Sequence, residues 1–232
     1  MKKVSSQTAL LLLAAGMLST TAFSLTSCTN SQPHKQEISS LSGTLEKISL
    51  LLADKPQEVD AGLFLHRILY TRPLVETFYV QVTGNERVSR AILSAADSND
   101  IPLPLAFALA WGESSYKVHA FNRNSGSVDR GLYQLNSKTF AFLNEDEFYS
   151  PEVNAGYGLA HLRFCLEEGE TEIVALAMYN AGATRVRRGT PYSTLNHVAK
   201  ILEYREELER SFETMLVDPG RIAAAMSSAD DS

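Results

Sequence analysis

The stretch Ile101 to Ser114 reads IPLPLAFALAWGES, and it places a single carboxylate at the end of a run of apolar residues. Pro104 suits the first turn of a helix, so we predict a helix over 105–112 that carries Glu113 at its carboxyl end. Apolar surroundings desolvate a carboxyl group and disfavour its anion, so we expect Glu113 to hold a proton that it can donate. The alternative is an exposed helix-end Glu, the commoner setting for a lone Glu.

Most of the remaining apolar residues recur at three- and four-residue spacing, which predicts a mainly α-helical protein. Segment 74–82 fits either a helix or a strand, because its spacing is helical but its β-branched and aromatic residues favour strands. Segment 120–133 is rich in Asn, Ser and Gly, which predicts a long loop or a small hairpin. The predicted helices span 38–52, 58–70, 88–96, 137–143, 151–167, 172–180 and 194–212.

The totals indicate one compact domain with additional helical material. The chain has 232 residues, of which 44% are hydrophobic and 21% charged, and its formal net charge is −6. No basic block interleaved with aromatic residues occurs, so we expect no nucleic-acid partner. The five histidines are scattered, and neither a CxxC nor an HExxH motif is present, so we expect no metal site and no cofactor.

The first residues indicate export. Lys2 and Lys3 precede a short apolar run, and the sequence LTSC ends at Cys28. This pattern predicts a signal peptide over 1–27 and resembles the bacterial lipobox, in which the cysteine after the cleavage site carries lipid. The alternative is ordinary cleavage with Cys28 as an incidental thiol. Lipidation would anchor the protein at the periplasmic face of the cell envelope, and Thr29 is compatible with delivery to the outer membrane.

We divide the rest of the chain into four segments. Residues 28–36 are predicted to be a flexible tether, 84–212 the main domain, and 213–232 a flexible C-terminal tail. Residues 37–83 form a helical N-terminal extension that either packs behind the main domain or holds an envelope protein partner. Cys165 lies in an apolar helical stretch and is predicted to be a small buried residue without a disulfide partner.

Three motifs occur in order along the main domain: Glu113-Ser114, then GLYQLN at 131–136, then AMYNAG at 177–182. Together they resemble the SLT domain of lytic transglycosylases, in the goose-type-lysozyme-like superfamily, over about residues 85–205. The resemblance implies a lysozyme-like helical catalytic domain with a small loop or hairpin at the cleft. It also implies that the substrate is the glycan strand of peptidoglycan.

The resemblance assigns roles residue by residue. It implies that Glu113 is the catalytic acid and then base, and that Ser114 hydrogen-bonds near it and near the substrate N-acetyl group. It places Gln134, Tyr179 and Asn180 in contact with sugar.

The sequence departs from the family at His197, where the family has a Tyr, at Tyr133, where it has a Met, and in a longer loop from Ser115 to Arg130. His197 would take the place of that Tyr at the substrate site and replace its hydrogen bond, or another Tyr such as Tyr192 would do so. A protonated His197 would favour the Glu113 anion.

Asp129 is the other acid of the motif region. Residues 125–137 also resemble the active-site hairpin of chicken-type lysozymes, whose second catalytic carboxylate would fall at Ser125. Asp129 instead matches an aspartate of that hairpin assigned to structural hydrogen bonding, so we expect Glu113 to act alone. With a lone acid the substrate must supply the nucleophile, and the resemblance implies a lytic transglycosylase that forms 1,6-anhydro-N-acetylmuramic acid. The alternatives are a hydrolase of the same bond and a non-catalytic peptidoglycan-binding or envelope-assembly lipoprotein.

Overall fold

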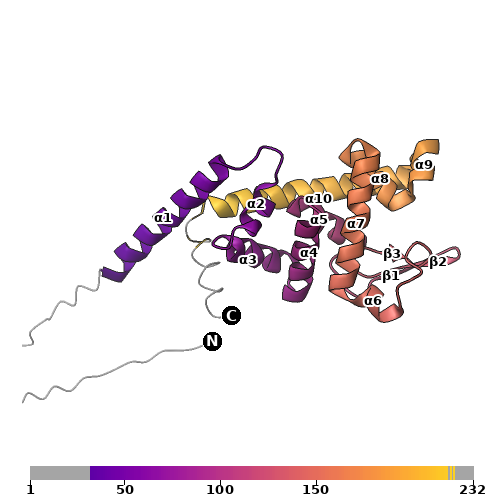
Figure 1. The fold of residues 1–232 in the computed structure, drawn as a ribbon, viewed down its shortest axis with the longest axis horizontal. Helices are drawn as coiled ribbons and strands as arrows, with labels where there is room; N and C mark the ends of the chain where they lie inside the picture. Colours follow the sequence, from indigo (N-terminus) through magenta and orange to yellow (C-terminus); the bar gives the residue numbers. More distant parts are fainter. Residues whose placement is uncertain (1–31, 219, 221, 223–232) are drawn as a thin grey trace, which may run out of the picture.

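The computed structural model describes residues 32–218, 220 and 222, and in this part the protein is mainly helical (Figure 1). Cys28, the signal segment 1–27 and the first residues of the tether lie outside the described residues. None of the described helices is long and apolar enough to cross a membrane. The helices are α1 (Gln32–Ala53), α2 (Ala61–Arg67), α3 (Arg72–Thr83), α4 (Glu86–Ser98), α5 (Leu103–Ser114), α6 (Glu145–Tyr149), α7 (Pro151–Gly169), α8 (Glu172–Ala181), α9 (Ala183–Arg188) and α10 (Tyr192–Leu216).

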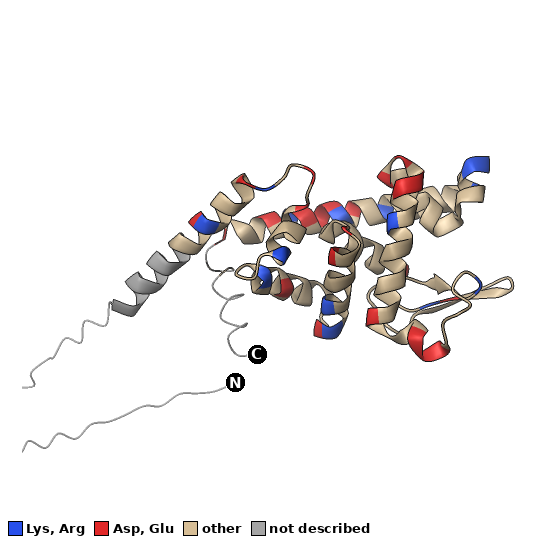
Figure 2. Cartoon of the chain, viewed as in Figure 1, with Lys and Arg blue, Asp and Glu red and all other residues tan. Residues whose placement is uncertain are grey.

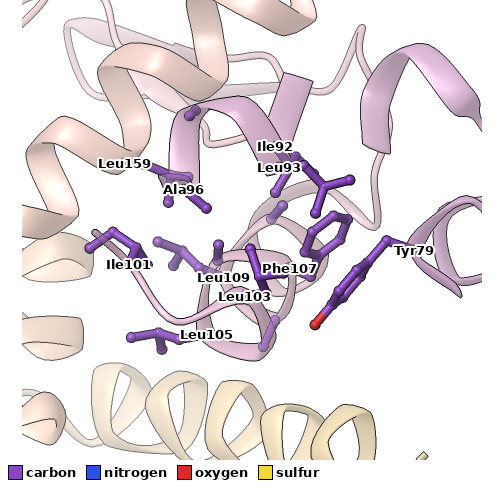
Figure 3. Close-up of a cluster of buried hydrophobic side chains, with 14 of the residues drawn as sticks. Tyr79, Ile92, Leu93, Ala96, Ile101, Leu103, Leu105, Phe107, Leu109 and Leu159 are labelled. Carbon is purple, nitrogen blue, oxygen red and sulfur yellow. The ribbon is translucent and has the colours of Figure 1, made fainter. Parts of the chain in front are cut away.

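Helix α5 is the central element of the fold. All of its residues from Leu103 to Ala110 are buried, as expected for a helix that is apolar on every side. Figure 3 shows Phe107 and Leu109 of this helix among Ile92 and Leu93 of α4. The long helix α10 runs beside α5, and α7 packs on α4 and α8 (Figure 1). The helix that ends at the predicted acid is therefore held by its neighbours on all sides.

The N-terminal helices α2 and α3 belong to the same core. The ring of Tyr79 on α3 stacks on Phe107 with 3.9 Å between centroids, and Phe78 meets Phe212 of α10 at 5.1 Å. Segment 74–82, whose pattern fitted either a helix or a strand, is helical. The helical spacing of its apolar residues directs the rings of Phe78 and Tyr79 into the core. The Asp60 carboxylate caps α2 through Leu63 N and also accepts from Leu103 N, which ties the extension to the start of α5.

Two predicted elements differ in the structure. The helix predicted at 137–143 is wrong, because this segment forms successive turns. A helix starts only at Asn144, whose side chain forms a capping box with Glu147 and so begins α6. Helix α9 was not predicted, and α10 extends from Tyr192 to Leu216. The predicted tail began at residue 213, whereas the structure buries Leu216 and Ile222.

A small antiparallel sheet stands beside the helices, and its first two strands lie within the segment predicted as a loop or hairpin. Strands β1 (Phe121–Asn124) and β2 (Ser127–Arg130) form the hairpin, and β3 (Leu135–Asn136) pairs with β2. The register sets Asn122 opposite Asp129 and Asp129 opposite Asn136. Because side chains alternate across a strand, this register collects polar side chains on one face of the sheet.

Asn154 on α7 fixes the sheet to the helices. Its buried side chain donates to the carbonyls of Arg130 and Phe148 and accepts from the amide of Tyr133. Gly131 lies against it with φ of 79°, and a Cβ there would stand 2.2 Å from Asn154 Nδ2. Only glycine fits this approach without strain. The GLYQLN motif therefore begins with a residue required by packing against α7.

Tyr133, where the family has a Met, is fully buried in the core. Its hydroxyl donates to the Ala106 carbonyl of α5 at 3.0 Å, and its ring occupies the space left by Gly158, whose added Cβ would meet the ring at 2.5 Å. The hydrogen bond satisfies a hydroxyl that would otherwise be costly to bury. Tyr133 thus joins the sheet, α5 and α7.

Candidate active site

A cleft of about 750 Å³ lies where the end of α5 meets the sheet, α8, α9 and α10. Two carboxylates, Glu113 and Asp129, line it, together with the basic side chains Arg185 and His197. Figure 2 shows the basic end of α9, the helix that carries Arg185. The remaining lining residues are Gly112, Asn122, Asn124, Ser127, Gln134, Asn136, Tyr179, Asn180 and Ala181.

Glu113 reaches the cleft because α5 ends beside it. Ser115 closes the helix in the left-handed conformation, with φ of 51°, and its amide bonds back to the Trp111 carbonyl. The side chain of Glu113 is 11% exposed, so its carboxyl group is largely withdrawn from water but still lines the cleft. A mostly desolvated carboxyl group that reaches a cleft is suited to proton transfer.

His197 on α10 contacts this carboxyl group directly. Its Nε2 lies 3.0 Å from Glu113 Oε1, and its side chain is 24% exposed. The imidazole can accept a hydrogen bond from a protonated carboxyl group or donate one to a carboxylate, depending on its tautomer. His197 can therefore remain hydrogen-bonded to Glu113 in both protonation states. Glu113 Oε2 has no hydrogen-bond partner within the described part of the chain.

The two residues before Glu113 bring α10 close enough for this contact. Gly112 faces Ile201 of α10, and a Cβ on Gly112 would stand 2.7 Å from Ile201 Cγ1. Trp111 stacks on Tyr204, one turn further along α10, with 4.3 Å between ring centroids. In the sequence Trp-Gly-Glu, the Trp packs on α10, the Gly leaves room for the close approach of α10, and the Glu supplies the carboxyl group.

Asp129, the second carboxylate of the cleft, is held within the sheet. Its Oδ2 accepts from Asn124 Nδ2 at 2.6 Å, and its Oδ1 accepts from Asn136 Nδ2 at 2.7 Å. Asn136 also donates to Ser127 Oγ, so the three strands share one hydrogen-bond network. Both oxygens of Asp129 are engaged, whereas Glu113 has one oxygen without a protein partner in the described residues.

The other residues that the sequence assigned to the site line the cleft, except for Ser114. Ser114 is buried, and its hydroxyl donates to the Ala110 carbonyl of its own helix, so it does not line the cleft. Gln134 lines the cleft in a left-handed conformation and donates to the Gly131 carbonyl. Asn180 also lines it, and its Oδ1 accepts from the Thr194 hydroxyl at 2.9 Å.

Tyr179 forms one wall of the cleft. Its hydroxyl donates to the Tyr133 carbonyl at 2.9 Å. Burial, and then the nearby Glu113 carboxylate, raises the pKa of the Tyr179 phenol well above its ordinary value. The phenol therefore stays neutral across the physiological range, and it acts here as a ring face and a fixed hydrogen-bond donor.

Sequence reasoning missed several residues that line the cleft, among them Asn122, Asn124, Asn136 and Arg185. Asn122 and Asn124 are two residues apart, which is the spacing that places side chains on one face of a strand. That signal was present, but it carried information only once the segment was known to be a hairpin. Arg185 follows Gly182, where the sequence indicated the end of a helix, and it enters the site on α9.

Residues 90–196 match the family model described as the transglycosylase SLT domain. No curated protein sequence matches the chain. The matched region includes Glu113, the sheet and the α8 segment that carries Tyr179 and Asn180, and it ends one residue before His197.

Proposed function

Because residues 90–196 are a transglycosylase SLT domain, a family that acts on peptidoglycan, we propose that the protein is a lytic transglycosylase with Glu113 as its single acid and base. It cleaves the β-1,4 bond between N-acetylmuramic acid and N-acetylglucosamine and leaves a 1,6-anhydro ring on the muramic acid. The reaction is a carbon–oxygen lyase reaction, because the ring closes without consuming water.

The reaction has two proton transfers, and both use the same carboxyl group. Glu113 first donates its proton to the glycosidic oxygen as the bond from that oxygen to C1 of the muramic acid breaks. The carbonyl oxygen of the muramoyl N-acetyl group stabilises the positive charge that develops at C1. The C6 hydroxyl oxygen of the same sugar then bonds to C1, and its proton passes to the Glu113 carboxylate. The enzyme returns to its starting protonation state.

The observation that carries this proposal is the difference between the two carboxylates of the cleft. A retaining hydrolase needs a carboxylate nucleophile, and an inverting one needs a second carboxylate to activate water. Asp129 is the only other carboxylate lining the described cleft, and two asparagine amides occupy its oxygens. A chain with one available carboxylate is suited to a reaction in which the substrate supplies the nucleophile.

His197 extends the proposal to the step between the two proton transfers. When Glu113 has given up its proton, the imidazole can donate Nε2–H to Oε1 and stabilise the carboxylate. When Glu113 is protonated again, the neutral imidazole can accept. Gln134, Asn180 and the ring of Tyr179 line the same cleft and would orient the sugars. Ser114 would contribute only by holding the end of α5.

We further propose that Cys28 is lipidated and that the protein works at the periplasmic face, anchored in the outer membrane. The proposal rests on the sequence LTSC and the following Thr29. Labelling with a fatty acid should modify the full chain and not its Cys28→Ser variant. Equal labelling of the two proteins would show that Cys28 is not the lipidated residue. We also propose a protein partner for residues 37–83, which would contact their exposed side, because Ile48 of α1 belongs to the core together with α2 and α3.

The test is mass spectrometry of peptidoglycan digested with the full chain, with its Glu113→Gln variant and with its Asp129→Asn variant. We expect anhydro-muropeptides, lighter by one water than hydrated ones, from the wild type and from Asp129→Asn, and none from Glu113→Gln. Hydrated products that require Asp129 would instead identify a hydrolase. No products from any of the three, together with retained binding to peptidoglycan, would identify a non-catalytic binding protein.

A further inference from the structure

The side chain of Asn180, near the end of α8, lines the cleft with an amide that has two unlike ends. The oxygen of an amide accepts hydrogen bonds and its nitrogen donates them, so the end that meets a ligand depends on the partner that holds the other. In Asn180 the Oδ1 accepts from the Thr194 hydroxyl at 2.9 Å, and the Nδ2 has no partner within the described residues. The donor end is therefore the one left to the cleft.

Thr194 holds the acceptor end from a buried position. It lies in the first turn of α10 and is 3% exposed. A threonine there often bonds to its own helix, but α10 has no side-chain capping bond. Within the part of the chain that the structure describes, Asn180 Oδ1 is the only hydrogen-bond partner of this hydroxyl. If the amide turned over, the hydroxyl proton would be buried without an acceptor, which is unfavourable.

The two residues come from separate helices whose relative position is fixed. Helices α8 and α10 pack on each other, and Arg205 of α10 pairs with Glu172 at the first residue of α8. The bond between Thr194 and Asn180 lies near the opposite end of α8. Because α10 holds α8 near both ends, the fold itself sets the direction of the Asn180 amide before any ligand arrives.

We propose that Thr194 is a positioning residue that turns the Asn180 amide so that its Nδ2 donates to an N-acetyl carbonyl oxygen of the glycan. The inference rests on the proposed function, because that function places a glycan in the cleft. A sugar hydroxyl can donate or accept, whereas an N-acetyl carbonyl oxygen only accepts and so needs a donor from the protein. Thr194 itself makes no contact with the sugar, since it does not line the cleft.

Thr194→Val tests the inference, because valine has the shape of threonine without its hydroxyl. The matched control is Thr71→Val, since Thr71 is 2% exposed, donates to the Leu65 carbonyl at 2.6 Å and does not line the cleft. Calorimetry with peptide-free glycan strands measures binding to the full chain in a Glu113→Gln background, without cleavage. The Kd should rise about 5-fold in Thr194→Val and stay unchanged in Thr71→Val and in Thr194→Ser, which keeps the hydroxyl.

Removing the Asn180 side chain separates positioning from a structural effect on α10. Thr194 lies about one turn before His197, so a shift of the helix would act through His197 and would persist in Asn180→Ala. We expect Asn180→Ala to weaken binding at least as much as Thr194→Val, and Thr194→Val to add nothing to it. With Glu113 intact, KM should rise and kcat should stay unchanged, because a bond to a group that does not react is made equally in the ground and transition states. A further loss in the double variant, or a lower kcat at unchanged KM, would overturn the inference.

Asn180→Asp tests which end of the amide the glycan meets. The aspartate still accepts from Thr194 but offers a second acceptor where the amide offers a donor. Its affinity, measured also for the uncharged hexamer of N-acetylglucosamine so that repulsion between carboxylates plays no part, should fall at least as far as in Asn180→Ala. Affinity equal to that of Glu113→Gln alone would mean that the glycan meets an acceptor, and the inference would be wrong. These binding results hold even if the wild type cleaves no glycan, whereas cleavage without any effect of Thr194→Val would refute the inference and leave the proposed function.

Discussion

Adding one methyl group at Gly112 tests whether the close approach of α5 and α10 sets the geometry of Glu113. In Gly112→Ala the new Cβ would stand 2.7 Å from Ile201 Cγ1 and 3.2 Å from Ile201 Cδ1. Two carbon atoms are at their optimal separation at about 3.5 to 4.0 Å, so α10 must move by about 1 Å. His197 lies one turn before Ile201 and moves with it.

Two effects oppose each other in the stability of this variant. Alanine is favoured over glycine inside a helix by about 1 kcal/mol, whereas overpacking a core costs about 1 to 3 kcal/mol. We therefore expect a net loss of about 1 kcal/mol, which leaves the protein folded. His197 Nε2 lies 3.0 Å from Glu113 Oε1, so a displacement of about 1 Å would carry the two atoms beyond hydrogen-bond distance. We expect kcat/KM to fall about 10- to 100-fold, far more than the stability change explains.

The assay measures chemical denaturation and glycan cleavage in Gly112→Ala and in Gly156→Ala. A Cβ on Gly156, within α7, would meet nothing within 4 Å, so that control should gain about 0.5 to 1 kcal/mol and keep its activity. Ile201→Ala removes both contact atoms, and combining it with Gly112→Ala should restore part of the lost activity. If Gly112→Ala behaved like Gly156→Ala in both measurements, the close packing would not be what aligns His197 with Glu113.

Two further predictions concern residues outside the reaction itself. Asn154→Ala removes the hydrogen bonds to the Tyr133 amide and to the carbonyls of Arg130 and Phe148, so the free energy of unfolding should fall by about 3 kcal/mol in urea denaturation. A loss below about 1 kcal/mol would mean that the sheet does not depend on Asn154. Cys165 is 1% exposed and burial raises the pKa of its thiol to about 11, so peptide mass spectrometry should find it unalkylated at pH 8 in the native protein and alkylated after denaturation. The same pKa shift disfavours the Cys165 thiolate in the folded state, so the free energy of unfolding should decline as the pH rises from about 9 to about 11. Rapid alkylation of the native protein would contradict both statements.

The sequence predicted the helices that pattern alone can specify. Helix α5 has an unbroken apolar run, and α7, α8 and α10 repeat apolar residues at helical spacing, so each was predicted with its ends within four residues of those in the structure. The segment 137–143 was assigned wrongly because local side-chain bonding outweighs its apolar content. The Asn136 side chain accepts from the Lys138 amide and holds the chain in a turn. The capping pair Asn144 and Glu147 was a signal in the sequence that we did not use.

The candidate site was predicted in its composition but not in its contacts. The family resemblance implied that Glu113, Gln134, Tyr179, Asn180 and His197 belong to one site, and in the structure all five line one cleft. The direct bond from His197 to Glu113 depends on the gap at Gly112, which no spacing rule reveals. The Ser114 side chain lies against its own helix, because its hydroxyl donates to the Ala110 carbonyl one turn earlier.

The stacking of Tyr79 on Phe107 has a consequence for which fragments of the protein can fold. Phe107 belongs to the helix that ends at Glu113, whereas Tyr79 and Phe78 precede the family match and Phe212 follows it. A fragment trimmed to residues 90–196 would expose the aromatic side of α5 to water and lose most of α10. We therefore expect a piece that folds to include at least α2 to the end of α10, so that the recognisable motif region is an inner part of a larger cooperative unit.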